Sequence, residues 1–274
     1  MRSSNPTLRA FEAPQTWDDA HAGRPLSKAG TNTMTIGGTV TATSILLGIC
    51  VAAAIGSWAA VSSANYAFLQ FPFLLGGMIG GLVFGLIISF KPRTAQFLAP
   101  VYAALQGLFL GAFSYMVGNM VAAKVGASGS GTQIGTTLVL QAIGLTFAIT
   151  AAMLFCYVSG IIKPGRVFRA VVVSAMGGLM LFFVVALVMS LFGNSTLISV
   201  YSPTNGGLIS VGFSLLVIVI ASLVLVLDFQ WIDHGIQAGL PKHMEWYAGF
   251  ALLVTLVWLY IEILRLLAKL RSNN

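Results

Sequence analysis

The sequence predicts an all-α integral membrane protein with seven transmembrane helices. Hydrophobic residues make up 57% of the 274 positions and charged residues only 8%, whereas a soluble domain carries about 25% charged residues. The apolar runs reach about 20 residues or more and do not alternate as barrel strands do. Because lipid offers no hydrogen-bond partners, backbone groups must be paired within each segment. The spanning segments are therefore expected to be helices.

The first part of the chain is polar and contains Pro6, Pro14 and Pro25 among charges of both signs. The first long apolar run begins near Met34, farther from the start than in a cleavable secretory signal. We predict that residues 1–33 form a poorly ordered cytosolic tail. Residues 34–274 are predicted to form the seven-helix transmembrane domain.

Seven apolar runs follow the tail, and most connections between them are short. The longest connections are the Gly/Ser-rich residues 124–135, with the flexible sequence GASGSG at 126–131, and the segments 194–206 and 233–244. The predicted helices cover residues 36–62, 67–90, 97–122, 136–162, 168–193, 207–232 and 245–268.

Glycines recur four positions apart in the second and third predicted helices: Gly77, Gly81, Gly85, Gly107 and Gly111. Such spacing lets helix backbones approach closely. We interpret the pattern as close packing inside one bundle. Dimerisation through these faces is the less favoured alternative.

Lys and Arg residues near the helix ends indicate the orientation of the chain. The side opposite the N-terminus carries only Lys124 in its loops, which predicts a cytoplasmic N-terminus. Seven full crossings would nevertheless place Arg265, Lys269 and Arg271 outside, so a re-entrant last segment stays an alternative. The net charge of +7 is spread over helix ends, so nucleic acid is not an expected partner. The cytoplasmic side would carry Arg2, Arg9, Arg24, Lys28, Lys91, Arg93, Lys163, Arg166, Arg169 and Lys242.

No catalytic constellation appears in the sequence. His21 lies in the tail, and His234 and His243 lie in the last connection without metal-ligand spacing to acidic or Cys partners. Neither a G-x-S-x-G elbow nor a phosphate-binding loop ending in Lys-Ser/Thr is present. Cys50 and Cys156 lie in separate apolar runs and are interpreted as core thiols. Neither an enzyme nor a bound cofactor is expected.

The seven acidic residues are few enough to be considered singly. Asp228 lies within the sixth predicted helix and Glu262 within the seventh, where burying an Asp costs about 2.5–3.5 kcal/mol. Such carboxylates are candidates for a functional site. The others lie in the tail or beside the last connection, where water can reach them: Glu12, Asp18, Asp19, Asp233 and Glu245.

Consecutive helices tend to form a hairpin, which would let Asp228 and Glu262 approach each other. Two carboxylates that share a site cannot easily both ionise, so a shared proton would make a pH-sensitive lock. A Ca²⁺ ion could replace the proton, since carboxylate oxygens are its preferred ligands. Two alternatives stay open. In the first, Glu262 and Arg265, three apart on one helix, neutralise each other. In the second, Asp228 is solvated near the cytoplasmic face.

Four stretches of the chain match the pattern of a known family: MRSSNP at the start, APVYAALQGLFLGAFS at 99–114, LDFQWIDHGI at 227–236 and EWYAGFALLVTLVWLYIEILRLL at 245–267. The sequence LDFQ is similar to a Tyr-Asp-Thr-Gln motif in the sixth helix, and LYIE to a Leu-Tyr-Leu-Asp motif in the last. Over nearly its whole length the chain resembles the Bax inhibitor-1/YccA family, in its bacterial branch.

This resemblance implies a seven-helix bundle with the last helix at its centre, surrounded by the other six. It also implies a pH-dependent calcium leak channel with a di-acidic sensor, to which Asp228 and Glu262 correspond as possible Ca²⁺ ligands. A basic residue at the cytoplasmic end of the second helix would latch the sixth-helix Asp. Arg93 is the candidate for that latch, with Lys91 second.

Three departures from the family pattern concern the site. The last acidic residue, Glu262, is one methylene longer than the family's Asp. The stretch between Asp228 and Glu262 is longer than in relatives. Gln106 stands where many relatives have Glu, so this position carries no charge.

The resulting hypothesis is a pH-sensitive calcium leak channel of the bacterial inner membrane, whose partners are the lipid bilayer and Ca²⁺ or protons. The alternative is a non-transporting regulator of a membrane-bound AAA protease or of a stress response, with the 33-residue tail as contact. A secondary transporter is the least favoured of the three hypotheses, because no internal repeat is visible in the sequence.

Overall fold

The computed structural model describes residues 33–126, 131–194 and 196–272. Residues 34–274 form one compact unit, distinct from residues 1–33. The predicted tail, apart from Thr33, and most of the GASGSG connection therefore lie outside the described residues.

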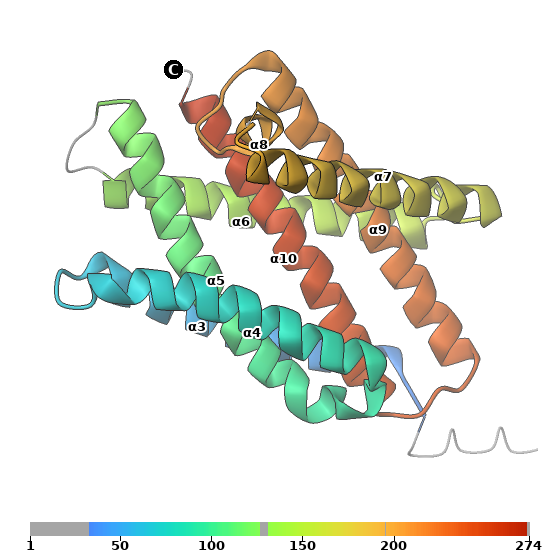
Figure 1. Cartoon of the computed structure of the whole chain (residues 1–274). Helices are drawn as coiled ribbons and strands as arrows, with labels where there is room; N and C mark the ends of the chain where they lie inside the picture. Colours follow the sequence, from blue (N-terminus) through green and yellow to red (C-terminus); the bar gives the residue numbers. More distant parts are fainter. Residues whose placement is uncertain (1–32, 127–130, 195, 273–274) are drawn as a thin grey trace, which may run out of the picture. The chain divides into compact units, whose positions relative to one another are not determined.

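Helices make up the regular structure of the described part, and seven of them are long and apolar enough to cross a membrane. The prediction of an all-α membrane protein with seven spans is confirmed. The helices, labelled as in Figure 1, are α3 (Ile36–Ser62), α4 (Gln70–Phe90), α5 (Ala95–Lys124), α6 (Gly131–Val158), α7 (Arg166–Leu191), α8 (Thr196–Tyr201), α9 (Leu208–Gln237) and α10 (Met244–Arg271), with 3₁₀ turns η1 (Ala67–Leu69) and η2 (Pro92–Thr94).

Some predicted boundaries differ from the observed ones. The fourth span ends at Val158 rather than at 162, and Gly160 follows with a positive φ of 73° that favours glycine. The sixth span continues to Gln237, beyond the predicted 232, and Gly239 ends it in the same left-handed conformation. The short helix α8, inside the connection 194–206, was not predicted.

Helix α10 is central to the compact unit, as predicted, but four of the other spans surround it rather than all six. It packs against α3, α5, α6 and α9, while α4 lies mainly on α5, and α7 mainly on α8 and α9 (Figure 1). Residues 262–265 are four consecutive buried positions. Since successive residues point about 100° apart, α10 is covered on every side at this level.

The glycines of α5 bring its backbone against α3. A Cβ added at Gly107 would collide with the Cys50 carbonyl oxygen, and one at Gly111 with the Ala54 carbonyl oxygen. The Ser57 hydroxyl donates across this contact to the Leu108 carbonyl at 2.8 Å. These two glycines thus serve packing inside the bundle, the interpretation favoured from their spacing.

The packing predicts a difference between two glycine substitutions. Gly111→Ala should lower the free energy of unfolding by about 1–3 kcal/mol, because the methyl group overpacks the α3–α5 contact. Gly144→Ala on α6 is the matched control, since a Cβ there meets no atom within 4 Å. Unfolding in detergent measures both, and equal stability of the two variants would contradict the proposed role of Gly111.

Candidate functional site

The Asp228 carboxylate lies between α9 and α10 and is half-buried. Its Oδ2 atom accepts a hydrogen bond of 2.6 Å from the Thr255 hydroxyl on α10. Asp228 also borders a cavity of about 190 Å³, whose wall includes Trp231, Tyr247 and Ala251. Among the described residues no cation pairs with this carboxylate, so its recorded partner is a neutral hydroxyl.

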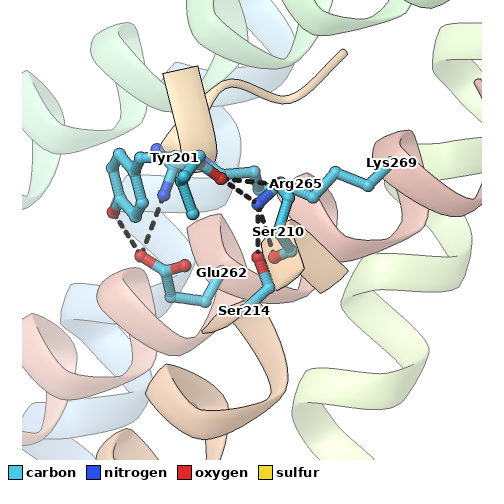
Figure 2. A network of polar contacts seen from close by, with 7 residues as sticks. Tyr201, Ser210, Ser214, Glu262, Arg265 and Lys269 are labelled. Carbon is cyan, nitrogen blue, oxygen red and sulfur yellow. Dashed lines mark hydrogen bonds and ion pairs between the residues drawn. The ribbon is translucent and has the colours of Figure 1, made fainter. Parts of the chain in front are cut away.

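Glu262 is fully buried on α10 and belongs to a different polar cluster. Its Oε1 accepts from Arg265 Nη1 at 2.9 Å and from the Tyr201 hydroxyl of α8 (Figure 2). The guanidinium of Arg265 also lies 3.5 Å from the centre of the Tyr201 ring. Partial burial raises the pKa of the Tyr201 phenol, so the phenol is protonated at neutral pH and available as a donor.

The structure does not bring Asp228 and Glu262 together. Thr255, the residue that contacts Asp228, precedes Glu262 by seven positions, which is about 10 Å along a helix. The paired-carboxylate geometry is therefore not present. The structure instead shows the first of the two alternatives given in the sequence analysis: Glu262 and Arg265, three residues apart, form an ion pair.

Counting along the hairpin gives the correct partner only from the observed helix ends, not from the predicted ends at 232 and 245. Asp228 lies nine residues before the end of α9 at Gln237, and Thr255 lies eleven residues after the start of α10 at Met244. In an antiparallel pair these positions are at similar depth, whereas Glu262 lies beyond them. The similarity of LYIE to a family motif indicated Glu262 as the partner of Asp228, whereas Thr255 lies outside that motif.

Lys269 completes the cluster around Glu262 and was not predicted as a site residue. Its ammonium donates to the carbonyl oxygens of Val200 and Ser210 and to the Ser214 hydroxyl (Figure 2). The cluster also concerns Arg265, Lys269 and Arg271, the three cations whose place near the C-terminus disagreed with the orientation predicted from the other Lys and Arg residues. Arg265 and Lys269 are buried inside the protein, and only Arg271 of the three is exposed.

Glu245 is not beside open water, contrary to the expectation from its position next to the last connection. It is 4% exposed, and its Oε1 accepts from the Thr35 amide at 3.0 Å and the Thr35 hydroxyl at 2.9 Å. Thr35 is the N-cap of α3, where a carboxylate is favoured by the helix dipole. Glu245 thus ties the start of α10 to the start of α3.

The predicted latch residue, Arg93, is exposed in η2. No hydrogen bond or ion pair within the described part of the chain joins Arg93 or Lys91 to Asp228, so the latch stays a prediction. Gln106 is half-buried and donates to the Tyr102 hydroxyl at 3.0 Å.

No cluster of three or more His, Cys, Asp or Glu side chains suited to a metal ion occurs among the described residues. The proposed Ca²⁺ ligands Asp228 and Glu262 lie at different levels of α10, since Asp228 contacts Thr255, seven residues before Glu262. Cys50 and Cys156 are free thiols, the first of them buried. A cavity of about 850 Å³ lies between α3, α6 and α9 and has Asp233 rather than Asp228 in its wall.

A protein-family model described as Bax inhibitor 1 like matches residues 5–272 of the chain. No curated protein and no solved structure matches it. The match covers both the Asp228–Thr255 contact and the cluster around Glu262.

Removing the Thr255 hydroxyl should weaken the α9–α10 contact. Thr255→Val is expected to lower the free energy of unfolding by about 0.6–1.7 kcal/mol, the value of hydrogen bonds between membrane helices. Thr255→Ser keeps the hydroxyl and should remain close to the parent protein. Unfolding of the purified protein in detergent measures the difference; a Thr255→Val variant as stable as the parent protein would show that the hydroxyl does not stabilise the α9–α10 contact.

Removing the Glu262 charge should be more costly. Glu262→Gln leaves Arg265 buried without a counter-charge and is expected to cost about 3–5 kcal/mol. The double variant Glu262→Gln/Arg265→Met removes both charges and should recover much of that loss. If Glu262→Gln alone unfolds like the parent protein, the ion pair does not stabilise this part of the bundle.

Proposed function

The chain belongs to the Bax inhibitor 1-like family, and from that premise we propose that it is a pH-sensitive cation leak channel with Ca²⁺ as the favoured ion. The membrane spans and the family membership supply the context. The observation that carries the proposal is Asp228, a carboxylate in the span α9 whose recorded partner is the neutral hydroxyl of Thr255.

A carboxylate in a membrane-spanning segment is costly and usually marks an ion or proton pathway. Asp228 differs in this respect from Glu262, whose charge is balanced by Arg265 at 2.9 Å. Asp228 also borders the 190 Å³ cavity, which gives a small ion or water room beside it. We therefore assign the role of pH sensor to Asp228 alone rather than to two carboxylates that share a proton.

The Asp228–Thr255 bond suggests how a proton would act. When Asp228 is ionised, the bond is charge-assisted, and such bonds are roughly twice as strong as neutral ones. Protonation of Asp228 removes the charge and weakens the link between α9 and the central helix α10. The leak is then favoured at acidic pH and suppressed at alkaline pH.

This proposal predicts the pH dependence of ion flux. Ca²⁺ flux into proteoliposomes should rise from mildly alkaline to mildly acidic pH for the parent protein. Asp228→Asn cannot ionise, so its flux should be independent of pH. Asp233→Asn is the matched control, because Asp233 is an exposed carboxylate five residues farther along α9, and its flux should follow the parent protein.

Two results would contradict the proposal. A pH dependence that survives in Asp228→Asn would exclude this carboxylate as the sensor. Absence of flux above empty liposomes at every pH would favour the alternative of a regulator that acts on a membrane-bound AAA protease. Deleting residues 1–30 and measuring binding to such a protease would then test whether the tail is the contact.

A further inference from the structure

The environment of Lys269 differs from that of an ordinary buried cation. The side chain is fully buried, and Nζ donates to the Val200 carbonyl at 2.9 Å, the Ser210 carbonyl at 3.0 Å and the Ser214 hydroxyl at 2.9 Å (Figure 2). An ammonium has three N–H donors, and all three are used. Each acceptor is a neutral oxygen.

No carboxylate within the described part of the chain forms an ion pair with Lys269. The nearby Glu262 forms its ion pair with Arg265 instead. The atoms that bond the Lys269 ammonium directly are therefore all neutral oxygens. Cation-selective pores hold their ions in the same way, with backbone carbonyl oxygens in place of the hydration shell.

Two of the three oxygens are backbone carbonyls, whose positions are set by α8 and α9 and not by Lys269. The Val200 carbonyl belongs to the last turn of α8 and also accepts from the Ser210 hydroxyl at 2.5 Å. Ser210 and Ser214 are one turn apart on α9 and both are buried. The oxygen cage, defined here as Val200 O, Ser210 O and Ser214 Oγ, thus rests on two helices and the bond between them.

We propose that this oxygen cage is a cation-binding site in its own right, occupied in this structure by the chain's own ammonium. Its ligand class is ammonium ions and large monovalent metal cations such as K⁺. The oxygens lie 2.9–3.0 Å from the nitrogen, whereas Ca²⁺ takes oxygen ligands at about 2.3–2.6 Å and Mg²⁺ at about 2.0–2.1 Å. The cage as built is too wide for either divalent ion.

A second feature of the same cluster favours a cation. Glu262 Oε2 is buried without a hydrogen-bond partner in the described structure, so a carboxylate oxygen with spare acceptor capacity lies in the polar cluster of Figure 2. The inference does not depend on the proposed leak, because the cage would bind a cation whether or not ions cross the protein.

The competing explanation is that Lys269 simply caps the C-terminal carbonyl of α8, as lysines often do. The two explanations differ in what remains after the ammonium is removed. A cap leaves no affinity for free cations, whereas a cation site stays behind as a vacant cage.

The test is chemical rescue of the full-length variant Lys269→Ala in detergent. Its melting temperature should fall below that of the parent protein. Methylammonium and K⁺ should restore more than half of the loss in a saturable manner, while bulky N-methylglucamine at equal ionic strength should not. Lys269→Met, which fills the space with an apolar chain, and Lys242→Ala, which removes an exposed lysine near the other end of α10, should show no cation-specific rise.

The double variant Ser214→Ala/Lys269→Ala removes one oxygen of the cage and should lose most of the rescue. No cation-specific rise in Lys269→Ala, or an equal rise with N-methylglucamine, would overturn the proposal in favour of a cap. None of these measurements involves flux, so failure of the site and failure of the proposed channel are distinguishable.

If Lys269→Ala does not fold, the proposal can be tested on the parent protein instead. Amine-reactive labelling followed by mass spectrometry should find Lys269 protected in N-methylglucamine salt and increasingly labelled as K⁺ replaces it, because K⁺ competes for the cage. Lys242 should label equally in both salts. Equal labelling of Lys269 in the two salts would overturn the proposal.

Discussion

A charge buried inside a membrane protein must find its partner within the protein, and α10 buries four charged side chains: Glu245, Glu262, Arg265 and Lys269. Their partners outside α10 come from three other helices. Glu245 accepts from Thr35 at the start of α3 and Glu262 from Tyr201 of α8, whereas Lys269 donates to the end of α8 and the start of α9. Because unpaired charges in this setting are costly, these contacts fix where the two ends of α10 lie relative to its neighbours. The apolar middle of the helix then packs between α3, α5, α6 and α9.

Hydropathy was sufficient to predict the seven spans, because a span must be long and apolar whatever surrounds it. It was not sufficient to predict α8. The six residues Thr196–Tyr201 are too few to register as a span, and they are held by side chains that come much later in the chain. The same limit applies to the acidic residues. Asp228 and Glu262 were correctly assigned to the last two long apolar helices, but their neighbours depend on where α9 ends and α10 begins. A shift of a few residues in that turn changes which side chain faces Asp228.

The positions of the basic residues illustrate a related point. A count of Lys and Arg treats every cation near a helix end as a loop charge. Arg265 and Lys269 are near the end of α10 in sequence, yet both are buried and bonded to other parts of the protein. Their contribution to orientation is therefore different from that of exposed residues such as Lys242. The predicted cytoplasmic N-terminus does not require the last helix to be re-entrant.

The bonds of Lys269 also bear on the order in which the protein is assembled. They join residues 55, 59 and 69 positions apart in sequence, so none can form until the last helix has entered the bilayer. Up to that moment α8 and the turn that follows it lack the ammonium that holds them. The polar cluster that joins α8, the start of α9 and α10 is therefore complete only after the last span has been synthesised. A chain that ended before Lys269 would leave this cluster without its ammonium.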